Sequence, residues 1–293
     1  MGSTASGKSA VAMAVARRLG DVELVSIDSM QVYRGMDIGT AKPSAAERAE
    51  IPHHLIDLVE PSHDFTVAEF QAAYASVVDA IGERRHRAIL VGGTGLYHRV
   101  VIDDFELPGE WPEVRADIEA EEDTAALFAR LSELDPAAAT KMEPTNRRRV
   151  IRALEVTMGS GRRFSSFGPG VDNYAPSVVM QIGLRWPRDV LTDRISDRVH
   201  GMIDAGLIAE VDALRATGFS RTAAQALGYK EILEALDGRI SKDEAIETII
   251  TRTRRFAVRQ ERWFRRDPRV RWIDVAHDPV AEAAPAVIDA LHP

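Results

Sequence analysis

Apolar and polar residues alternate over the first part of the chain in a way that predicts strands and helices in turn. Short apolar runs at 22–28 and 87–95 are typical of buried strands, and the second runs into glycines. Residues 9–20 and 66–85 have helical periodicity, and Thr66 is placed to cap the second helix. This alternation predicts an α/β fold in which helices cover both faces of a parallel sheet.

The rest of the chain has a different pattern. Residues 111–168 are helical and highly charged with no strand signal, which indicates a helical insertion. An apolar strand resumes at 177–186, helices follow from 189–218 onward, and 269–275 has the pattern of a last strand. We therefore expect three parts: a P-loop catalytic core in 1–110, the insertion in 111–168, and a core continuation with a helical C-terminal region in 169–293.

The stretch before the first helix has a phosphate-binding pattern. Residues 2–9, GSTASGKS, fit G-x-x-x-x-G-K-[ST], in which amides and the helix N-terminus bind phosphate, Lys8 adds a charge and Ser9 can ligate Mg²⁺. A buried strand normally precedes such a loop, and here only Met1 does. We expect a core that lacks its first strand, and a chain less stable and less active than one with that strand restored.

Two polar residues follow the predicted strands. Asp28 ends the strand at 22–28 and Thr94 follows the strand at 87–95, and ligands of parallel α/β folds bind beyond such ends. Asp28 can act as a general base, ligate a metal or cap a turn, and Thr94 can bind substrate or close a turn. Nucleotide-hydrolysing P-loop proteins place a magnesium acid where this chain has Gly92. The loop is therefore expected to hold a diphosphate that leaves.

Composition narrows the class of protein. The 293 residues are 45% hydrophobic and 28% charged, as in globular proteins, and they include no cysteine, which excludes disulfides and thiolate metal sites. His53 and His54 are adjacent, which favours a loop over a metal site. No apolar run reaches the roughly 18 residues that span a membrane, and no signal peptide is evident. We expect a cytoplasmic protein without a membrane partner.

Positive charge is concentrated in two places although the net charge is −8. Residues 252–271 contain nine arginines against two carboxylates, and Arg152 extends the cluster 147–149. Phosphate backbones respond to such local patches, while a solvated helix face is the alternative. Arg194 and Arg198 lie one helical turn apart, where they either reach phosphate oxygens or form surface ion pairs.

Six blocks along the chain resemble the successive signatures of bacterial tRNA dimethylallyltransferases. In order they are GSTASGKS, VSIDSMQVYRGMDIGTAKP, PHHLIDLVEP, LVGGTGLY, RRVIRALEV and QALGYKE, and the resemblance runs from residue 2 to about residue 275. It implies transfer of a dimethylallyl group from dimethylallyl diphosphate to the exocyclic amine of the adenosine 3′ of a tRNA anticodon, with release of diphosphate. It also implies Mg²⁺ as cofactor and an anticodon stem-loop as partner, and we expect a monomer.

The resemblance also implies roles for single residues. The catalytic set is Asp28, which takes the amine proton, with Thr94 and Arg198, the latter near the leaving diphosphate. The phosphate-binding residues are Gly2, Ser3, Thr4, Ala5, Ser6, Gly7, Lys8 and Ser9, with Mg²⁺ on Ser9. The tRNA-contact residues are Asp28, Ser29, Met30, Gln31, Thr94, Arg115, Arg148, Arg149, Val150, Ile151, Arg152, Gln225, Ala226, Leu227, Gly228, Tyr229 and Lys230.

Three other functions stay open. An adenylate isopentenyltransferase would prenylate a free nucleotide, but it needs neither the helical insertion nor the basic C-terminal region. A P-loop small-molecule kinase would need a magnesium acid after an apolar strand, which ILVGGTG does not supply. If the chain is instead an RNA-binding P-loop protein without turnover, changing Asp28 should alter neither its RNA affinity nor its function.

Overall fold

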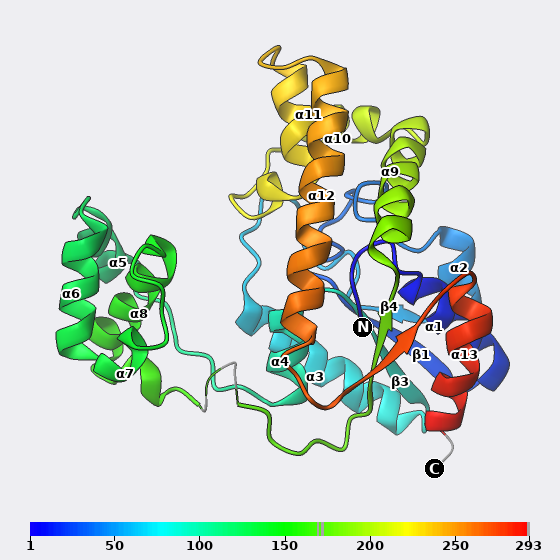
Figure 1. Cartoon of the computed structure of the whole chain (residues 1–293), viewed down its shortest axis with the longest axis horizontal. Coiled ribbons are helices and arrows are strands. Elements are labelled where there is room, and N and C mark those ends of the chain that lie inside the picture. The colour runs from blue at the N-terminus through cyan, green and yellow to red at the C-terminus, as the bar shows by residue number, and fades with distance from the viewer. Residues whose placement is uncertain (169, 171–172, 292–293) are drawn as a thin grey trace. The chain divides into compact units, whose positions relative to one another are not determined.

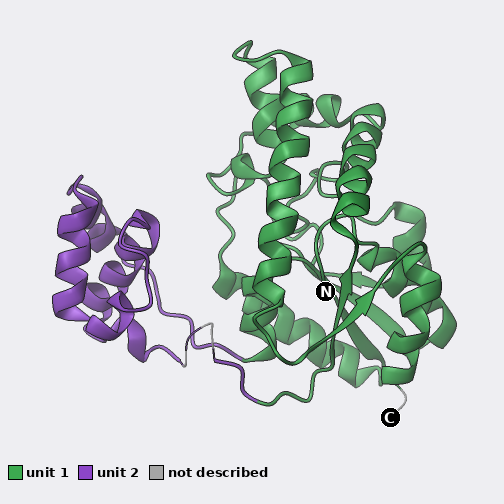
Figure 2. Cartoon of the chain, in the orientation of Figure 1, with its two compact units in different colours: residues 1–103, 176–293 green, residues 104–175 purple. Residues whose placement is uncertain are grey.

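The computed structural model describes residues 1–168, 170 and 173–291. Figure 2 shows that these residues form two compact units. The larger unit comprises residues 1–103 and 176–293, and the smaller one comprises 104–175. The stretch 111–168, expected to be a helical insertion, lies within the smaller unit.

Three parallel strands form the sheet of the larger unit. They are β1 (Val22–Ile27), β2 (His53–His54) and β3 (Arg87–Gly92), in the order β2-β1-β3. The strands expected at 22–28 and 87–95 are confirmed. The expectation that His53 and His54 lie in a loop is wrong, because they pair with Leu24 and Val25 of β1.

Helices α1 (Lys8–Leu19) and α3 (Val67–Glu83) cover opposite faces of this sheet (Figure 1). Leu24 of β1 packs in one apolar cluster with α1, whereas Ile27 packs in another cluster with Phe70 of α3. Successive side chains of a strand point to opposite faces, so one strand serves both clusters. Both expected helices are confirmed, and the hydroxyl of Thr66 caps α3 by accepting from the amide of Glu69.

A second parallel pair follows the smaller unit in the chain. It consists of β4 (Gln181–Arg185) and β5 (Val270–Asp274), so the strands expected at 177–186 and 269–275 are confirmed. Gly2 makes a single parallel bridge to Leu184 of β4. The expectation that 177–186 continues the core sheet is therefore wrong. β4 belongs to a second, short sheet, because it pairs with β5 and Gly2 rather than with β3.

The remaining elements of the larger unit are helical. They are α2 (Ala45–Glu50), α4 (Gly95–Ile102), α9 (Arg188–Asp204), α10 (Leu207–Arg215), the 3₁₀ turn Ala223–Gln225, α11 (Tyr229–Leu236), α12 (Lys242–Phe264) and α13 (Pro279–Ala290). In Figure 1, α9 to α12 gather into a bundle above the sheets, and α13 lies beside α1. Among the described residues, no helix is both long and apolar enough to cross a membrane.

The smaller unit has its own hydrophobic core. Its elements are α5 (Pro112–Glu119), α6 (Thr124–Leu134), α7 (Pro136–Ala139), α8 (Arg147–Ser160) and the 3₁₀ turn Phe164–Ser166. Leu131 of α6 and Leu154 of α8 are both fully buried and belong to one hydrophobic cluster. Because these contacts lie within residues 104–175, the unit is held together by its own side chains.

Candidate active site

Residues 2–9 form a loop that leads directly into α1. Gly7, at the N-cap of α1, has φ 87°, and a Cβ on it would lie 2.5 Å from Cγ of Pro279, so this position requires glycine. Within the described chain, the amides of Ser6 and Gly7 donate to no protein acceptor, and the buried hydroxyl of Ser6 has no partner. Unsatisfied donors at the N-terminus of a 12-residue helix form an anion site.

Three side chains from distant segments hold this loop by its backbone. Nε1 of Trp186 donates to the carbonyl of Ser6 at 3.0 Å, and Nε of Arg194 donates to the carbonyl of Ala5 at 3.0 Å. Arg194 also stacks over the Trp186 ring at 4.2 Å, and Oε1 of Gln260 accepts from the amide of Thr4 at 2.8 Å. Of the two arginines that are candidates to reach phosphate oxygens, Arg194 therefore binds the loop itself, through the carbonyl of Ala5. The amide of Thr4 is likewise committed to Gln260.

Two cations face this site without a carboxylate bound to them. Nζ of Lys8 donates to the carbonyl of Ser3 at 2.6 Å, and among the described residues neither Lys8 nor Arg198 forms an ion pair. Burial, followed by the charge of Arg198, lowers the pKa of Lys8 to about 8, while Asp28 opposes the shift. Burial also lowers the pKa of Arg198, again opposed by Asp28. The three charges therefore act on one another in one site.

Asp28 and Thr94 lie at the carboxyl ends of β1 and β3, as expected. The hydroxyl of Thr94 accepts from the amide of Ser29 at 3.1 Å, which joins the two loops. Oδ1 of Asp28 accepts from the amide of Met30 at 2.9 Å, and Oδ2 has no partner among the described residues. Asp28 thus caps its own turn with one oxygen and leaves the other free to accept a proton.

Gln31 holds the loop that follows instead of pointing freely into the site. Its Nε2 donates to the carbonyls of Thr40 and Ala41 at 3.1 and 3.3 Å, and its Oε1 accepts from the hydroxyl of Ser26 at 2.7 Å. The carboxylate of Glu210 on α10 supports the same loop from outside. It accepts from the amide of Ile38 at 2.7 Å, from two neighbouring amides, and from the hydroxyl of Tyr229 at 2.5 Å.

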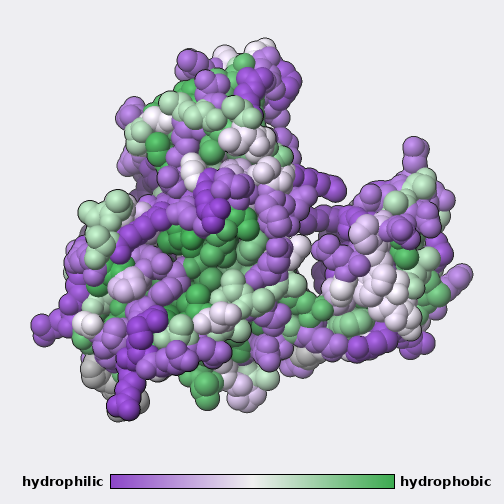
Figure 3. Space-filling view, turned by 180° about the vertical axis from the view of Figure 1, so that it is seen from behind, coloured by the Kyte–Doolittle hydropathy of each residue, from purple (hydrophilic) through white to green (hydrophobic). Residues whose placement is uncertain are grey.

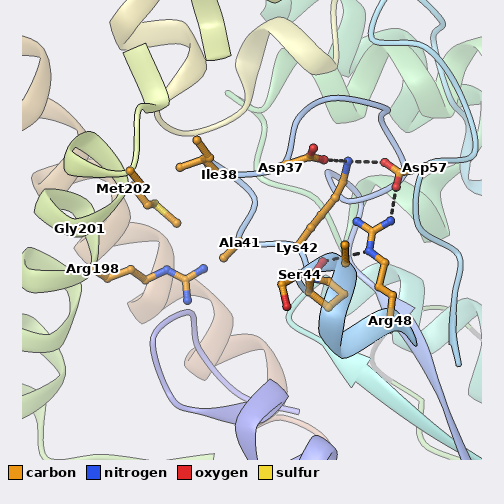
Figure 4. Close-up of a pocket in the computed structure, with 13 residues that line it drawn as sticks. Asp37, Ile38, Ala41, Lys42, Ser44, Arg48, Asp57, Arg198, Gly201 and Met202 are labelled. Carbon is orange, nitrogen blue, oxygen red and sulfur yellow. Dashed lines mark hydrogen bonds and ion pairs between the residues drawn. The ribbon is translucent and has the colours of Figure 1, made fainter. Parts of the chain in front are cut away.

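This supported loop forms one wall of a pocket of about 620 Å³. Figure 4 shows Arg198 and Met202 of α9 facing Ala41 across the opening, with the guanidinium of Arg198 directed into it. The side chain of Lys42 is buried behind the loop, where Nζ contacts Asp37 at 2.8 Å and Asp57 at 2.5 Å. The pocket thus presents one unpaired cation beside apolar side chains. Seen from behind, the larger unit also has hydrophobic surface in a hollow bordered by hydrophilic residues (Figure 3).

The expected tRNA-contact residues divide into exposed and buried ones. Arg148 and Arg149 on α8 are exposed without an ion-pair partner in the described structure, whereas Arg115 and Arg152 both contact the buried carboxylate of Glu155. The residues whose side chains are buried in the cores of their units are Val150, Ile151, Ala226 and Tyr229. Gln225 is exposed, Gly228 is buried, and Leu227 and Lys230 are half-buried.

The arginines of 252–271 divide in the same way. Arg252 is paired with Glu231 at 2.6 Å, Arg265 with Glu261 at 2.7 Å, and Arg269 with two aspartates. Exposed guanidiniums at Arg255, Arg259 and Arg262 recur every three or four residues along α12. That spacing places them on one face of the helix, so α12 carries a basic stripe.

Comparison with known proteins finds relatives that match most of this chain. The IPP transferase family model matches residues 31–267. A tRNA dimethylallyltransferase of Kineococcus radiotolerans is 49% identical, with 93% of this chain and 89% of the relative covered. The relative of the same name in Pseudarthrobacter chlorophenolicus is 47% identical, with 97% and 95% covered.

Two solved structures resemble the chain throughout its length. The full-length tRNA isopentenylpyrophosphate transferase of Bacillus halodurans has a TM-score of 0.73 at 41% identity, covering 99% of this chain and 93% of that one. A eukaryotic dimethylallyltransferase, described as acting on tRNA, has a TM-score of 0.80 at 26% identity, covering 98% of this chain and 76% of that one.

Proposed function

The chain belongs to the IPP transferase family, and on that premise we propose that it transfers a dimethylallyl group from dimethylallyl diphosphate to a tRNA. The acceptor is the exocyclic amine of the adenosine 3′ of the anticodon. The observation that carries the proposal is the meeting of Lys8, Asp28 and Arg198, three charges without ion-pair partners among the described residues, at the carboxyl edge of the sheet.

The donor binds through its diphosphate in this proposal. The amides of residues 5–9 and the ammonium of Lys8 hold phosphate oxygens, and Arg198 reaches the diphosphate from the pocket wall. Burial and the charge of Arg198 lower the pKa of Lys8, and burial lowers the pKa of Arg198, so a bound anion would stabilise the charged form of both side chains. The negative charge of the diphosphate grows as the C–O bond breaks, so these fixed cations stabilise the transition state more than the ground state.

The acceptor amine is activated by Asp28. Its lone pair is delocalised into the adenine ring, so the amine is a weak nucleophile and must be positioned against the allylic carbon. As the N–C bond forms and the C–O bond breaks, the amine loses one proton to Oδ2 of Asp28, and diphosphate leaves with the bonding electron pair. Thr94 fixes the loop that carries Asp28 by accepting from the amide of Ser29.

A magnesium ion fits this donor set only as a partner of the diphosphate. Ser9 is exposed and its hydroxyl has no protein partner in the described chain, while the described residues contain no cluster of three His, Cys, Asp or Glu that could hold a metal. Mg²⁺ commonly binds through one protein ligand plus phosphate oxygens and water. We propose that Ser9 would supply that ligand, and a bound ion would neutralise part of the negative charge of the leaving diphosphate.

The tRNA binds through exposed arginines in this proposal. A stacked adenine cannot reach an enclosed carbon, so the base must be extruded from the anticodon loop. Arg148 and Arg149 of the smaller unit, and the basic stripe of α12, provide charges for the phosphate backbone. The reaction needs a single chain, because Lys8, Asp28 and Arg198 all belong to its larger unit. Since the acceptor is a tRNA, we propose that the reaction takes place in the cytoplasm.

One assay tests the proposal against its alternatives. The protein is mixed with Mg²⁺, labelled dimethylallyl diphosphate and either an anticodon stem-loop or AMP. We expect label in the stem-loop and little in AMP. Preferential labelling of AMP would instead identify an adenylate isopentenyltransferase. Consumption of ATP without labelling would support a kinase, and RNA binding without either reaction would leave a binding protein.

A further inference from the structure

Gln260 is a buried polar side chain whose amide group joins two loops of the site. It lies on α12 and is 7% exposed. Its Oε1 accepts from the amide of Thr4 at 2.8 Å, and its Nε2 donates to the carbonyl of Gly93 at 2.9 Å. Both functional groups of one side chain are therefore bound to backbone, one in the phosphate loop and one in the loop after β3.

Two glycines allow α12 to approach the second loop this closely. A Cβ on Gly93 would lie 2.2 Å from Nε2 of Gln260, and a Cβ on Gly95 would lie 2.2 Å from Cδ1 of Trp263. Contacts under 3 Å do not occur with real Cβ atoms, so a side chain at position 93 would displace the amide group of Gln260, and one at position 95 would displace the ring of Trp263. The GGTG sequence is therefore matched to two side chains of α12, independently of any ligand.

The contacts continue from Gly93 to the proposed base. Thr94 is the next residue, and its hydroxyl accepts from the amide of Ser29 at 3.1 Å. Ser29 follows Asp28 directly, and Asp28 accepts from Met30 at 2.9 Å in the same turn. One helix thus supports the phosphate loop and, through a short series of hydrogen bonds, the loop that holds the carboxylate.

The opposite side of the same helix carries the basic stripe. Arg259 precedes Gln260 and is exposed, as are Arg255 and Arg262. We propose that Gln260 is a positioning residue that couples RNA docking on this stripe to the geometry of the phosphate loop and of Asp28. The proposal rests on the function proposed above. Docked RNA fixes the position of α12, and Gln260 transmits that position to Thr4 and Gly93 because its two hydrogen bonds tolerate little displacement.

The test measures this coupling by binding. Titration calorimetry gives the Kd of inorganic diphosphate with Mg²⁺, in the presence and absence of a saturating anticodon stem-loop. The variant Gln260→Met keeps the length of the side chain and removes both hydrogen bonds. The control Thr253→Val removes another buried polar group from α12, two helical turns away from Gln260.

The coupling ratio is the Kd of diphosphate without the stem-loop divided by the Kd with it. We expect this ratio to be alike in the wild type and in Thr253→Val. In Gln260→Met we expect it to be closer to one by a factor of about five or more. An unchanged ratio in Gln260→Met, or a ratio of one in the wild type, would overturn the proposal. Labelling of RNA by the wild type is measured alongside. Its absence counts against the proposed function, whatever the ratio is.

Gln260→Glu provides a second variant that retains the shape of the side chain. Its neutral carboxyl group can accept from Thr4 and donate to Gly93, whereas the ionised form can only accept. As the pH is lowered, we therefore expect the coupling ratio of Gln260→Glu to approach the ratio that the wild type has at the same pH. A relative ratio that does not change with pH would contradict the role given to the hydrogen bond to Gly93.

Discussion

The two ends of β1 use charge in opposite ways. At the carboxyl end, Asp28 faces Lys8 and Arg198, and none of the three forms an ion pair among the described residues. At the other end, about 16 Å along the strand, the buried carboxylate of Glu23 is fully paired. Arg84 donates to both of its oxygens at 2.8 Å, and His54 and His86 each contact one.

The difference indicates which end serves the fold and which serves the chemistry. Two like charges held close together cost stability, and such an arrangement is typical of a site whose ligand neutralises them. Paired charges are stabilised by the hydrogen bonds between them, and they offer no free charge to a substrate. Changes at the carboxyl end should therefore affect turnover, and changes at the other end should affect stability.

The largest effect is expected at Asp28. Asp28→Asn keeps the shape of the side chain and the hydrogen bond from Met30 but removes the proton acceptor. We expect the single-turnover rate of prenyl transfer to fall about 10²- to 10⁴-fold, with the free energy of unfolding nearly unchanged. Rapid-quench labelling and urea unfolding measure the two quantities. A rate within threefold of the wild type, roughly the error of such comparisons, would remove Asp28 from the mechanism.

Glu23→Gln should lower stability and leave the transfer rate unchanged, the reverse of the effect expected for Asp28→Asn. Removing the charge weakens the hydrogen bonds that this buried carboxylate accepts from the half-exposed Arg84, so the free energy of unfolding should fall by about 1.5–3 kcal/mol, while the folded protein keeps its transfer rate. The matched control is Glu50→Gln, which breaks the exposed pair with Arg17 and should change the free energy of unfolding far less than Glu23→Gln does. Equal destabilisation by both changes would contradict the contrast between the two ends.

The same carboxylate predicts how stability depends on pH. The guanidinium of Arg84, with smaller contributions from His54 and His86, holds the pKa of Glu23 at about 2 against burial, compared with an ordinary value of 4.5. A folded-state pKa below the unfolded one contributes stability above pH 4.5, and that contribution is lost as the pH falls toward 2. Acid unfolding of Glu23→Gln should therefore be less steep in this window than that of the wild type.

Arg198→Gln should weaken catalysis and leave the fold intact. Arg198 makes no hydrogen bond or ion pair with another described residue, so its replacement by glutamine breaks no polar contact among them. We expect a loss of about 10²- to 10³-fold in transfer rate. Arg188→Gln, exposed at the start of the same helix, serves as the control and should be neutral. Full activity of Arg198→Gln would place the diphosphate elsewhere.

The smallest effect concerns the protonation of Lys8. Its pKa of about 8 means that the free protein loses this charge as the pH rises above 8, so the affinity for diphosphate should fall by up to tenfold per pH unit there. In Lys8→Arg the charge persists. Calorimetry from neutral to alkaline pH gives the Kd of diphosphate for the wild type and for Lys8→Arg. Dividing one by the other removes the effect of the ionisation of diphosphate itself. A quotient that does not change with pH would contradict the lowered pKa of Lys8.

Much of this site can be predicted from local sequence. The loop at 2–9, Lys8 at the start of α1, and the carboxyl ends of two strands follow from short patterns of glycine, charge and apolar residues. The hydrogen bond between Ser29 and Thr94 confirms that the two strand ends meet. Such features are local, or follow from the geometry of parallel sheets.

The supporting side chains could not be found in this way. Gln260 and Trp186 contact the phosphate loop across 256 and 180 positions of the chain, and nothing in their neighbouring residues signals those partners. Tyr229 lies in a recognisable block, but its burial and its contact with Glu210 depend on how α10 and α11 pack. The strand at His53–His54 is too short to have a period.

The most direct test compares the two ends in one assay. Labelled dimethylallyl diphosphate, Mg²⁺ and an anticodon stem-loop are given to equal amounts of folded wild type, Asp28→Asn and Glu23→Gln, and the position of the label in the RNA is determined by mass spectrometry. The account predicts a dimethylallyl group on the adenosine 3′ of the anticodon with the wild type and Glu23→Gln, and almost none with Asp28→Asn. No label with the wild type, or equal labelling by all three proteins, would contradict it.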